Sequence, residues 1–123
     1  MPRLLIAAAA LALGAGPQVS AASASPELLE PAFSNTIVST YPDGRQAKLW
    51  LNRDGSFRAQ GRRGQPSSGQ WALKGEQICL KQKKPFPAPM TYCTGVKTGG
   101  VGTSWGGRAV TGEAIKISVI AGR

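Results

Sequence analysis

The one catalytic-looking pattern in this 123-residue sequence surrounds Ser104. Residues 102–106 match G-x-S-x-G, the pattern that carries the nucleophilic serine of α/β hydrolases. That chemistry needs a histidine to accept the serine proton, and the chain contains no histidine. It also needs a strand-to-helix turn, whereas these glycines are typical of a loose turn before a strand. We therefore interpret the match as coincidental.

The sequence also lacks suitably placed residues for acid–base catalysis by carboxylates or for metal binding. Five of the six acidic residues stand in turns or in the N-terminal part of the mature chain, namely Glu27, Glu30, Asp43, Asp54 and Glu76, and only Glu113 begins a predicted strand. Turn geometry accounts for the aspartates beside glycine without any catalytic role. Two cysteines without histidine are too few ligands for a tetrahedral zinc site. The sequence therefore predicts a protein that is not an enzyme and that uses no cofactor or metal.

Positive charge is the most pronounced chemical feature, because 15 Lys and Arg against 6 Asp and Glu give a net charge of +9. The basic residues form two groups near an aromatic side chain: Arg58, Arg62 and Arg63; Lys81, Lys83 and Lys84; and Trp50. Such groups suit a polyanion, a lipid headgroup or an acidic face of a protein. An exposed tryptophan beside arginine would also favour binding. These are the candidate binding residues, and the alternative is a charge that only keeps the protein soluble.

The N-terminus has the three parts of a secretory signal peptide. Arg3 precedes an apolar run over residues 4–13, and Ala22-Ser23-Ala24 resembles a cleavage site. The run is too short for a membrane anchor, and no later run is long enough to span a bilayer. We predict a signal peptide at 1–24, a flexible segment at 25–34, and one domain at 35–123, exported to the periplasm or beyond. Loss of Arg3, the only charge in the signal, lowers the net charge from +9 to +8.

Cys79 and Cys93 would then lie in an oxidising compartment, where a pair normally forms a disulfide. They lie on neighbouring predicted strands and bracket a loop that contains Pro85, Pro87 and Pro89. Closing a ring of this length stabilises a small domain by about 3 kcal/mol in the chain-entropy model. The sequence therefore predicts one stabilising disulfide.

The remaining mature chain shows strand patterns separated by turn residues. Apolar side chains alternate in most of these runs, which cover 36–41, 46–52, 56–62, 70–74, 77–81, 91–98, 104–110 and 113–121. Turns such as Pro42-Asp43-Gly44 and Asp54-Gly55 separate them, and no helical period appears. About seven to eight short strands predict an antiparallel all-β barrel or sandwich. A barrel is favoured, because closure removes exposed sheet edges.

Two resemblances accompany this interpretation. Gly69, Trp71, Leu73 and the following Cys79 are similar to the G-x-W-x-L opening and the cysteine of bacterial periplasmic metalloprotease inhibitors, which are lipocalin-like barrels with one disulfide. In that family the pattern opens the mature domain, whereas here other strands precede it. The inhibitors' reactive N-terminal segment therefore has no counterpart that can be carried over.

Over its whole length the chain resembles small exported bacterial proteins with a shared set of short motifs. In this sequence they are Asn35–Val38, Pro42–Gly44, Asp54-Gly55, Gly69–Trp71, Pro85-Phe86 and Tyr92-Cys93. The resemblance implies the same architecture and assigns no activity. We therefore expect a monomeric, non-enzymatic exported binding protein, with an anionic envelope component as its candidate ligand. The alternative is a lipocalin-like protease inhibitor.

Overall fold

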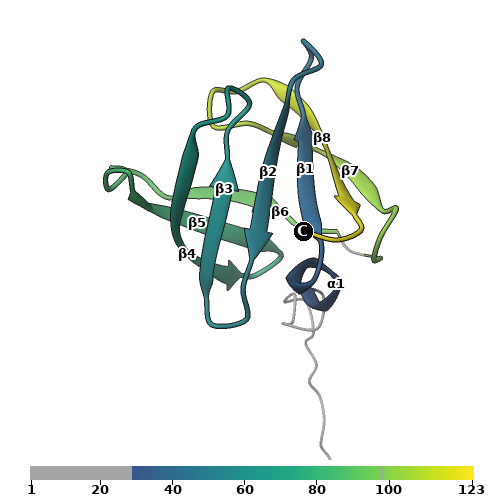
Figure 1. Ribbon diagram of the computed structural model, residues 1–123, viewed down its shortest axis with the longest axis horizontal. Coiled ribbons are helices and arrows are strands. Elements are labelled where there is room, and N and C mark those ends of the chain that lie inside the picture. Colours follow the sequence, from purple (N-terminus) through teal and green to yellow (C-terminus); the bar gives the residue numbers. More distant parts are fainter. Residues whose placement is uncertain (1–28, 98) are drawn as a thin grey trace, which may run out of the picture.

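Alternating apolar residues and glycine-containing turns build eight antiparallel strands that curl into a nearly closed barrel (Figure 1). The computed structural model describes residues 29–97 and 99–123. Its elements are α1 (Glu30–Phe33), β1 (Thr36–Thr40), β2 (Gln46–Leu51), β3 (Ser56–Gln60), β4 (Pro66–Lys74), β5 (Gln77–Lys84), β6 (Tyr92–Gly95), β7 (Ser104–Arg108) and β8 (Ala114–Ile120). The predicted all-β class is confirmed, and the barrel is the form it takes.

The strands follow the order β6-β5-β4-β3-β2-β1-β8-β7, so β1 lies mid-sheet and pairs with β8. All other neighbours are sequential hairpins. The outer strands β6 and β7 face each other across a seam without forming a ladder. Side chains bridge this seam: the Tyr92 hydroxyl donates to the carbonyl of Arg108, and Trp105 Nε1 donates to the carbonyl of Gly95 at 3.3 Å. The barrel is thus closed by ladders on all sides but one.

The barrel has two distinct ends. The helix α1 lies beneath the lower end in Figure 1, beside the C-terminus. Because β1 runs away from α1, the turns β1–β2, β3–β4 and β7–β8 all lie at the upper end. The core fills the lower half, where Leu51 and Phe57 pack with Leu29 of the α1 region and Ile78 of β5. A smaller cluster of Ala109, Ile115 and Ile117 lies toward the upper end.

Several boundaries differ from the sequence expectations. Residues 29–34, expected within a flexible segment, begin at the buried Leu29 and form α1 against the core. The strand β4 begins at Pro66 rather than residue 70, and β5 continues to Lys84 rather than residue 81. Both extensions are polar, so alternation gave no signal for them. Residues 66–69 are strand because they pair with β3, and the extension of β5 is strand because it pairs with Ser68 and Gly69. A proline is tolerated at Pro66 because it opens the strand.

The predicted disulfide is confirmed. Cys79 of β5 and Cys93 of β6 are direct cross-strand partners, with Cα atoms 4.0 Å apart. Their neighbours Ile78, Leu80 and Tyr92 point to the barrel interior, so pleating places the bridge on the outer face. The bond ties the four-residue edge strand β6 to β5, its only ladder partner among the described strands.

The predicted signal peptide at 1–24 lies outside the described residues. Within residues 29–97 and 99–123, no helix has the length and hydropathy that crossing a membrane would require.

Candidate functional site

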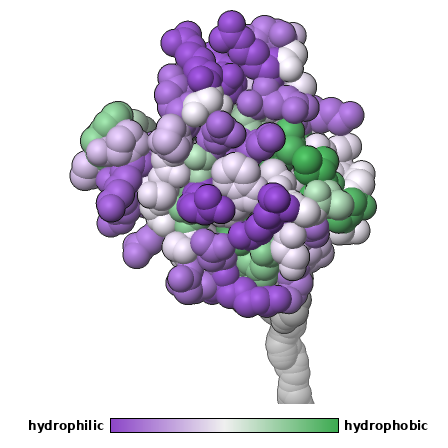
Figure 2. Space-filling model, in the orientation of Figure 1, coloured by the Kyte–Doolittle hydropathy of each residue, from purple (hydrophilic) through white to green (hydrophobic). Residues whose placement is uncertain are grey.

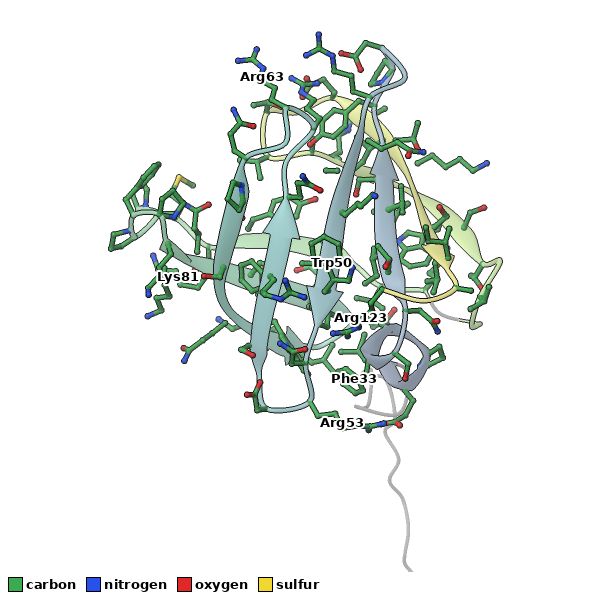
Figure 3. All side chains as sticks on the ribbon, viewed as in Figure 1. Phe33, Trp50, Arg53, Arg63, Lys81 and Arg123 are labelled. Atoms are coloured by element: carbon green, nitrogen blue, oxygen red, sulfur yellow. A yellow bond between two sulfur atoms is a disulfide. The ribbon has the colours of Figure 1, made fainter. Side chains whose placement is uncertain are left out.

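Three of the candidate binding residues lie in one row on the outer face of the barrel. The register pairs Trp50 of β2 with Arg58 of β3, and Arg58 with Ser68 of β4. Ser68 in turn pairs with Lys84 of β5. Directly opposed residues share a face of the sheet, so these four side chains are lateral neighbours across four strands. Figure 3 shows Trp50 in the middle of this outer face.

A register irregularity selects which lysine joins the row. The β4–β5 ladder shifts between Ser68 and Gly69, because Gly69 pairs with Gln82 whereas Ser68 pairs with Lys84. The shift leaves Lys83 as the extra residue of a bulge. Without it, Lys83 would stand opposite Ser68. The bulge therefore places Lys84 in the row, on the far side of Ser68 from Arg58.

This row forms the wall of an outer groove of about 600 Å³. The lining consists of two cations, an indole, and small or amide residues: Trp50, Arg58, Ala59, Gln60, Gly64, Pro66, Ser67, Ser68, Lys84 and Pro85. None of these is acidic. The face is mostly hydrophilic in Figure 2, and apolar groups gather at two edges of the view: on the Pro-rich loop between β5 and β6, where Phe86 and Met90 are exposed, and on the opposite, right-hand side. The groove thus offers positive charge beside an aromatic surface.

Hydrogen bonds fix the orientation of Trp50. Its Nε1 donates to the Thr36 hydroxyl oxygen at 2.9 Å, and that hydroxyl donates to the carbonyl of Gly122 at 2.7 Å. Thr36 is buried, so the anchor is shielded from water. The guanidinium of Arg58 lies 5.2 Å from the centre of the Trp50 ring, within the range of a cation–π contact. An indole held in this way presents a fixed surface next to a cation.

Arg62 does not belong to this groove. The strand β3 ends at Gln60, so Arg62 stands in the following turn and not at the end of a strand over residues 56–62 as predicted. Its guanidinium lies 4.3 Å from the centre of the Tyr41 ring and 3.0 Å from a carboxylate oxygen of Glu113. Tyr41, Arg62 and Glu113 belong to three different upper turns, and we call them the clasp. Arg62 is thus held by the fold.

Charge and burial shift the pKa values within the clasp. Partial burial raises the pKa of Tyr41 above its ordinary value, and the charge of Arg62 opposes that effect. A hydrogen bond from the Thr111 hydroxyl lowers the pKa of Glu113, with smaller contributions from its own backbone and from Arg62. Glu113 therefore remains ionised to a lower pH in the folded protein than in the unfolded chain.

The clasp leads us to expect an acid-sensitive contribution to stability. Because the folded-state pKa of Glu113 is depressed, its contribution is complete above the ordinary value of 4.5 and is lost as pH falls through the folded-state pKa. We expect Glu113→Gln to lower the melting temperature at neutral pH, with the difference from wild type narrowing on acidification. Melting curves from neutral to acidic pH measure this.

Glu76→Gln is the control, because it makes the same change in the exposed β4–β5 turn. It should leave the pH profile near that of wild type. An unchanged gap between Glu113→Gln and wild type at all pH values would contradict the role assigned to this carboxylate.

The other candidate cations do not converge on the groove. Lys81 donates from Nζ to the carbonyl of Ala88, which ties β5 to the Pro-rich loop. Lys83 is exposed at the bulge, and Arg63 is exposed at the tip of the β3–β4 turn, at the top of Figure 3. The two basic groups therefore contribute one residue each, Arg58 and Lys84, to the groove lining.

The groove also contains residues that the sequence analysis did not single out. Ser68, Pro66 and Pro85 line it, and Ser68 separates its two cations. Of these, Pro85 had a signal in the sequence, since it follows Lys84 directly. Ser68 could be found only from the register of three strands.

The remaining motifs have structural positions. Trp71 and Leu73 of the G-x-W-x-L pattern pack against the lower core, and Trp71 lies beside Phe33 with ring centres 5.8 Å apart. Ser104 of the G-x-S-x-G match begins β7 and is exposed. In the part of the chain that the structure describes, no three His, Cys, Asp or Glu side chains cluster as metal ligands would. The outer groove is therefore the strongest candidate for a binding site, because it combines two cations with an indole.

No family model, curated protein or solved structure matches this chain.

Proposed function

We propose that this chain is a non-enzymatic binding protein, acting after export, that holds an anionic polymer in the outer groove. The observation that carries the proposal is the row Trp50–Arg58–Ser68–Lys84 in a groove without an acidic lining residue. Two cations beside an aromatic ring suit repeated anionic groups that alternate with less polar segments. An envelope polyanion is the ligand class with this chemistry.

The charge balance of the described residues supports the same proposal. Salt bridges engage Arg45, Arg53 and Arg62 with three of the carboxylates. Among the described residues, Arg58 and Lys84 form no salt bridge. They are therefore free to pair with a ligand without first breaking an ion pair.

The test is calorimetric titration of the protein with short-chain polyphosphate. If both groove cations contact phosphates, counterion release predicts a roughly sevenfold loss of affinity between ~50 and ~200 mM salt. Arg58→Gln and Lys84→Gln should each weaken binding about three- to fivefold, the effect of losing one exposed ion pair worth up to ~1 kcal/mol.

Lys74→Gln is the matched control, because it removes one positive charge from an exposed position of β4 toward the other end of the barrel. It should change affinity little. Equal losses in all three variants would mean that only net charge matters, and a salt-independent affinity would also contradict the proposal.

A further inference from the structure

A second cavity lies inside the barrel, and it shares the lining residues Ala59, Gln60 and Ser67 with the outer groove. Its volume is about 220 Å³. Inward-pointing residues of all eight strands line it, among them Ile37 of β1, Leu49 of β2, Leu80 of β5, Trp105 of β7 and Ile117 of β8. Only the barrel interior is accessible to every strand at once.

The cavity exists because side-chain size changes along the barrel axis. In the lower half, large inward residues such as Leu51, Phe57 and Ile78 fill the interior. In the upper half, Ser39, Ala47, Ala59 and Ser67 stand at the inward positions of β1 to β4. These four small side chains on consecutive strands leave the upper interior empty, whereas the large side chains fill the lower interior. The cavity therefore follows from the sequence of side-chain sizes along the strands.

The chemistry of the wall is apolar with hydroxyl groups. Leu49, Leu80, Trp105 and Ile117 supply hydrocarbon and aromatic surface, whereas Ser39, Ser67 and Thr94 supply hydroxyls. No carboxylate or guanidinium belongs to the lining. The one cationic lining residue is Lys48, which is exposed and alternates to the outer face. Such a wall favours an uncharged ligand that carries a hydrogen-bonding group.

The size of the cavity narrows the ligand class. An apolar cavity of about 150 Å³ is known to accept benzene. At the packing density of protein interiors, the present cavity has room for a ligand of roughly 150 Å³. That corresponds to two fused rings or a short branched chain. Drug-sized molecules are too large.

We propose that the interior cavity binds a small uncharged ring compound with one hydroxyl or similar polar group. Access is from the upper end, where Gly61 and Val110 of two turns belong to the lining. The clasp joins these same turns through Arg62 and Glu113. The cavity and the outer groove share three lining residues, but the groove cations Arg58 and Lys84 do not line the cavity, so occupancy of one site does not require occupancy of the other.

The test is a calorimetric titration of the protein with 2-naphthol. Ala47→Leu adds three carbon atoms at an inward wall position and should weaken binding at least about tenfold, since cavities that are already filled exclude ligand. Ala72→Leu makes the same change at an exposed position of β4 and should bind as wild type does. Polyphosphate affinity should be the same in both variants, because neither residue lines the groove.

A measurement on the wild-type protein keeps the proposal testable if Ala47→Leu does not fold. Saturation with 2-naphthol should shift the methyl NMR signals of Ile37, Leu49 and Ile117 and leave those of the exposed Ile120 in place. Absence of binding by the wild type, unchanged binding by a folded Ala47→Leu protein, or shifts confined to surface methyl groups would each overturn the proposal.

Discussion

Gly69→Ala is expected to destabilise the barrel by about 3 kcal/mol, the upper end of the usual cost of overpacking. A Cβ atom at Gly69 would overlap the carbonyl oxygen of Lys81 and lie 2.9 Å from both its carbonyl carbon and an edge atom of the Phe57 ring. The obstacle on one side is the backbone of β5, so a rotamer change cannot relieve it. The two strands must separate at the bulge. Thermal unfolding should show a melting temperature lower by roughly 12–24 °C.

Gly106→Ala is the matched control. It is also a strand glycine, but an added Cβ there meets nothing within 4 Å, and its φ lies outside the left-handed region. It should be neutral or stabilise by about 0.4–1 kcal/mol, because alanine restricts the unfolded chain. Equal destabilisation by both variants would show that the close approach at Gly69 is not the cause.

Gly69→Ala should affect binding as well. The bulge beside Gly69 brings Lys84 opposite Ser68, so separating β4 from β5 displaces one groove cation. A folded Gly69→Ala protein that retained full polyphosphate affinity would argue against the register as the origin of the groove.

Removing the disulfide is expected to cost about 3 kcal/mol, the chain-entropy value for a loop of this length. Cys79 and Cys93 are 14 positions apart in the sequence. The double variant Cys79→Ala/Cys93→Ala should therefore unfold at a clearly lower denaturant concentration than the oxidised wild type. Hydrogen exchange should increase most at β6, because β5 is the one strand in residues 29–97 and 99–123 that pairs with it.

Reduction provides the control for this prediction. Dithiothreitol should lower the unfolding midpoint of the wild type and leave that of the double variant unchanged. A wild-type midpoint that stays constant, once thiol titration shows complete reduction, would contradict a stabilising role for the bond.

Local patterns in the sequence were sufficient for most of the fold. Alternation located Leu49 and Leu51 on the inward face of β2, and Asp-Gly pairs located turns, because both signals act over a few residues. The polar starts and ends of β4 and β5 carry no such signal. The start of β4 is strand because it pairs with β3, and the end of β5 is strand because it pairs with that part of β4; both pairings are properties of the folded chain.

The sequence was sufficient to predict which residues belong to the candidate site, but not how they are arranged in space. Composition and spacing singled out Arg58, Lys84 and Trp50. Their convergence depends on three registers and one bulge, which no local pattern specifies. Arg62 has the same side chain as Arg58, but it contacts Tyr41 and Glu113 of two other turns. These contacts hold Arg62 away from the groove, and no local pattern in the sequence predicts them.

The pairing of β1 with β8 has a consequence for when this chain can fold. The Thr36 hydroxyl bonds the carbonyl of Gly122, 86 positions away, and residues 36–40 find half of their ladder partners only in residues 116–120. At ordinary translation rates, roughly 4–17 s separate the synthesis of these two strands. During that interval β1 has one open edge and the barrel cannot close. We therefore expect the barrel to close only after residues 116–120 have been synthesised, with the slow kinetics of non-local β pairing.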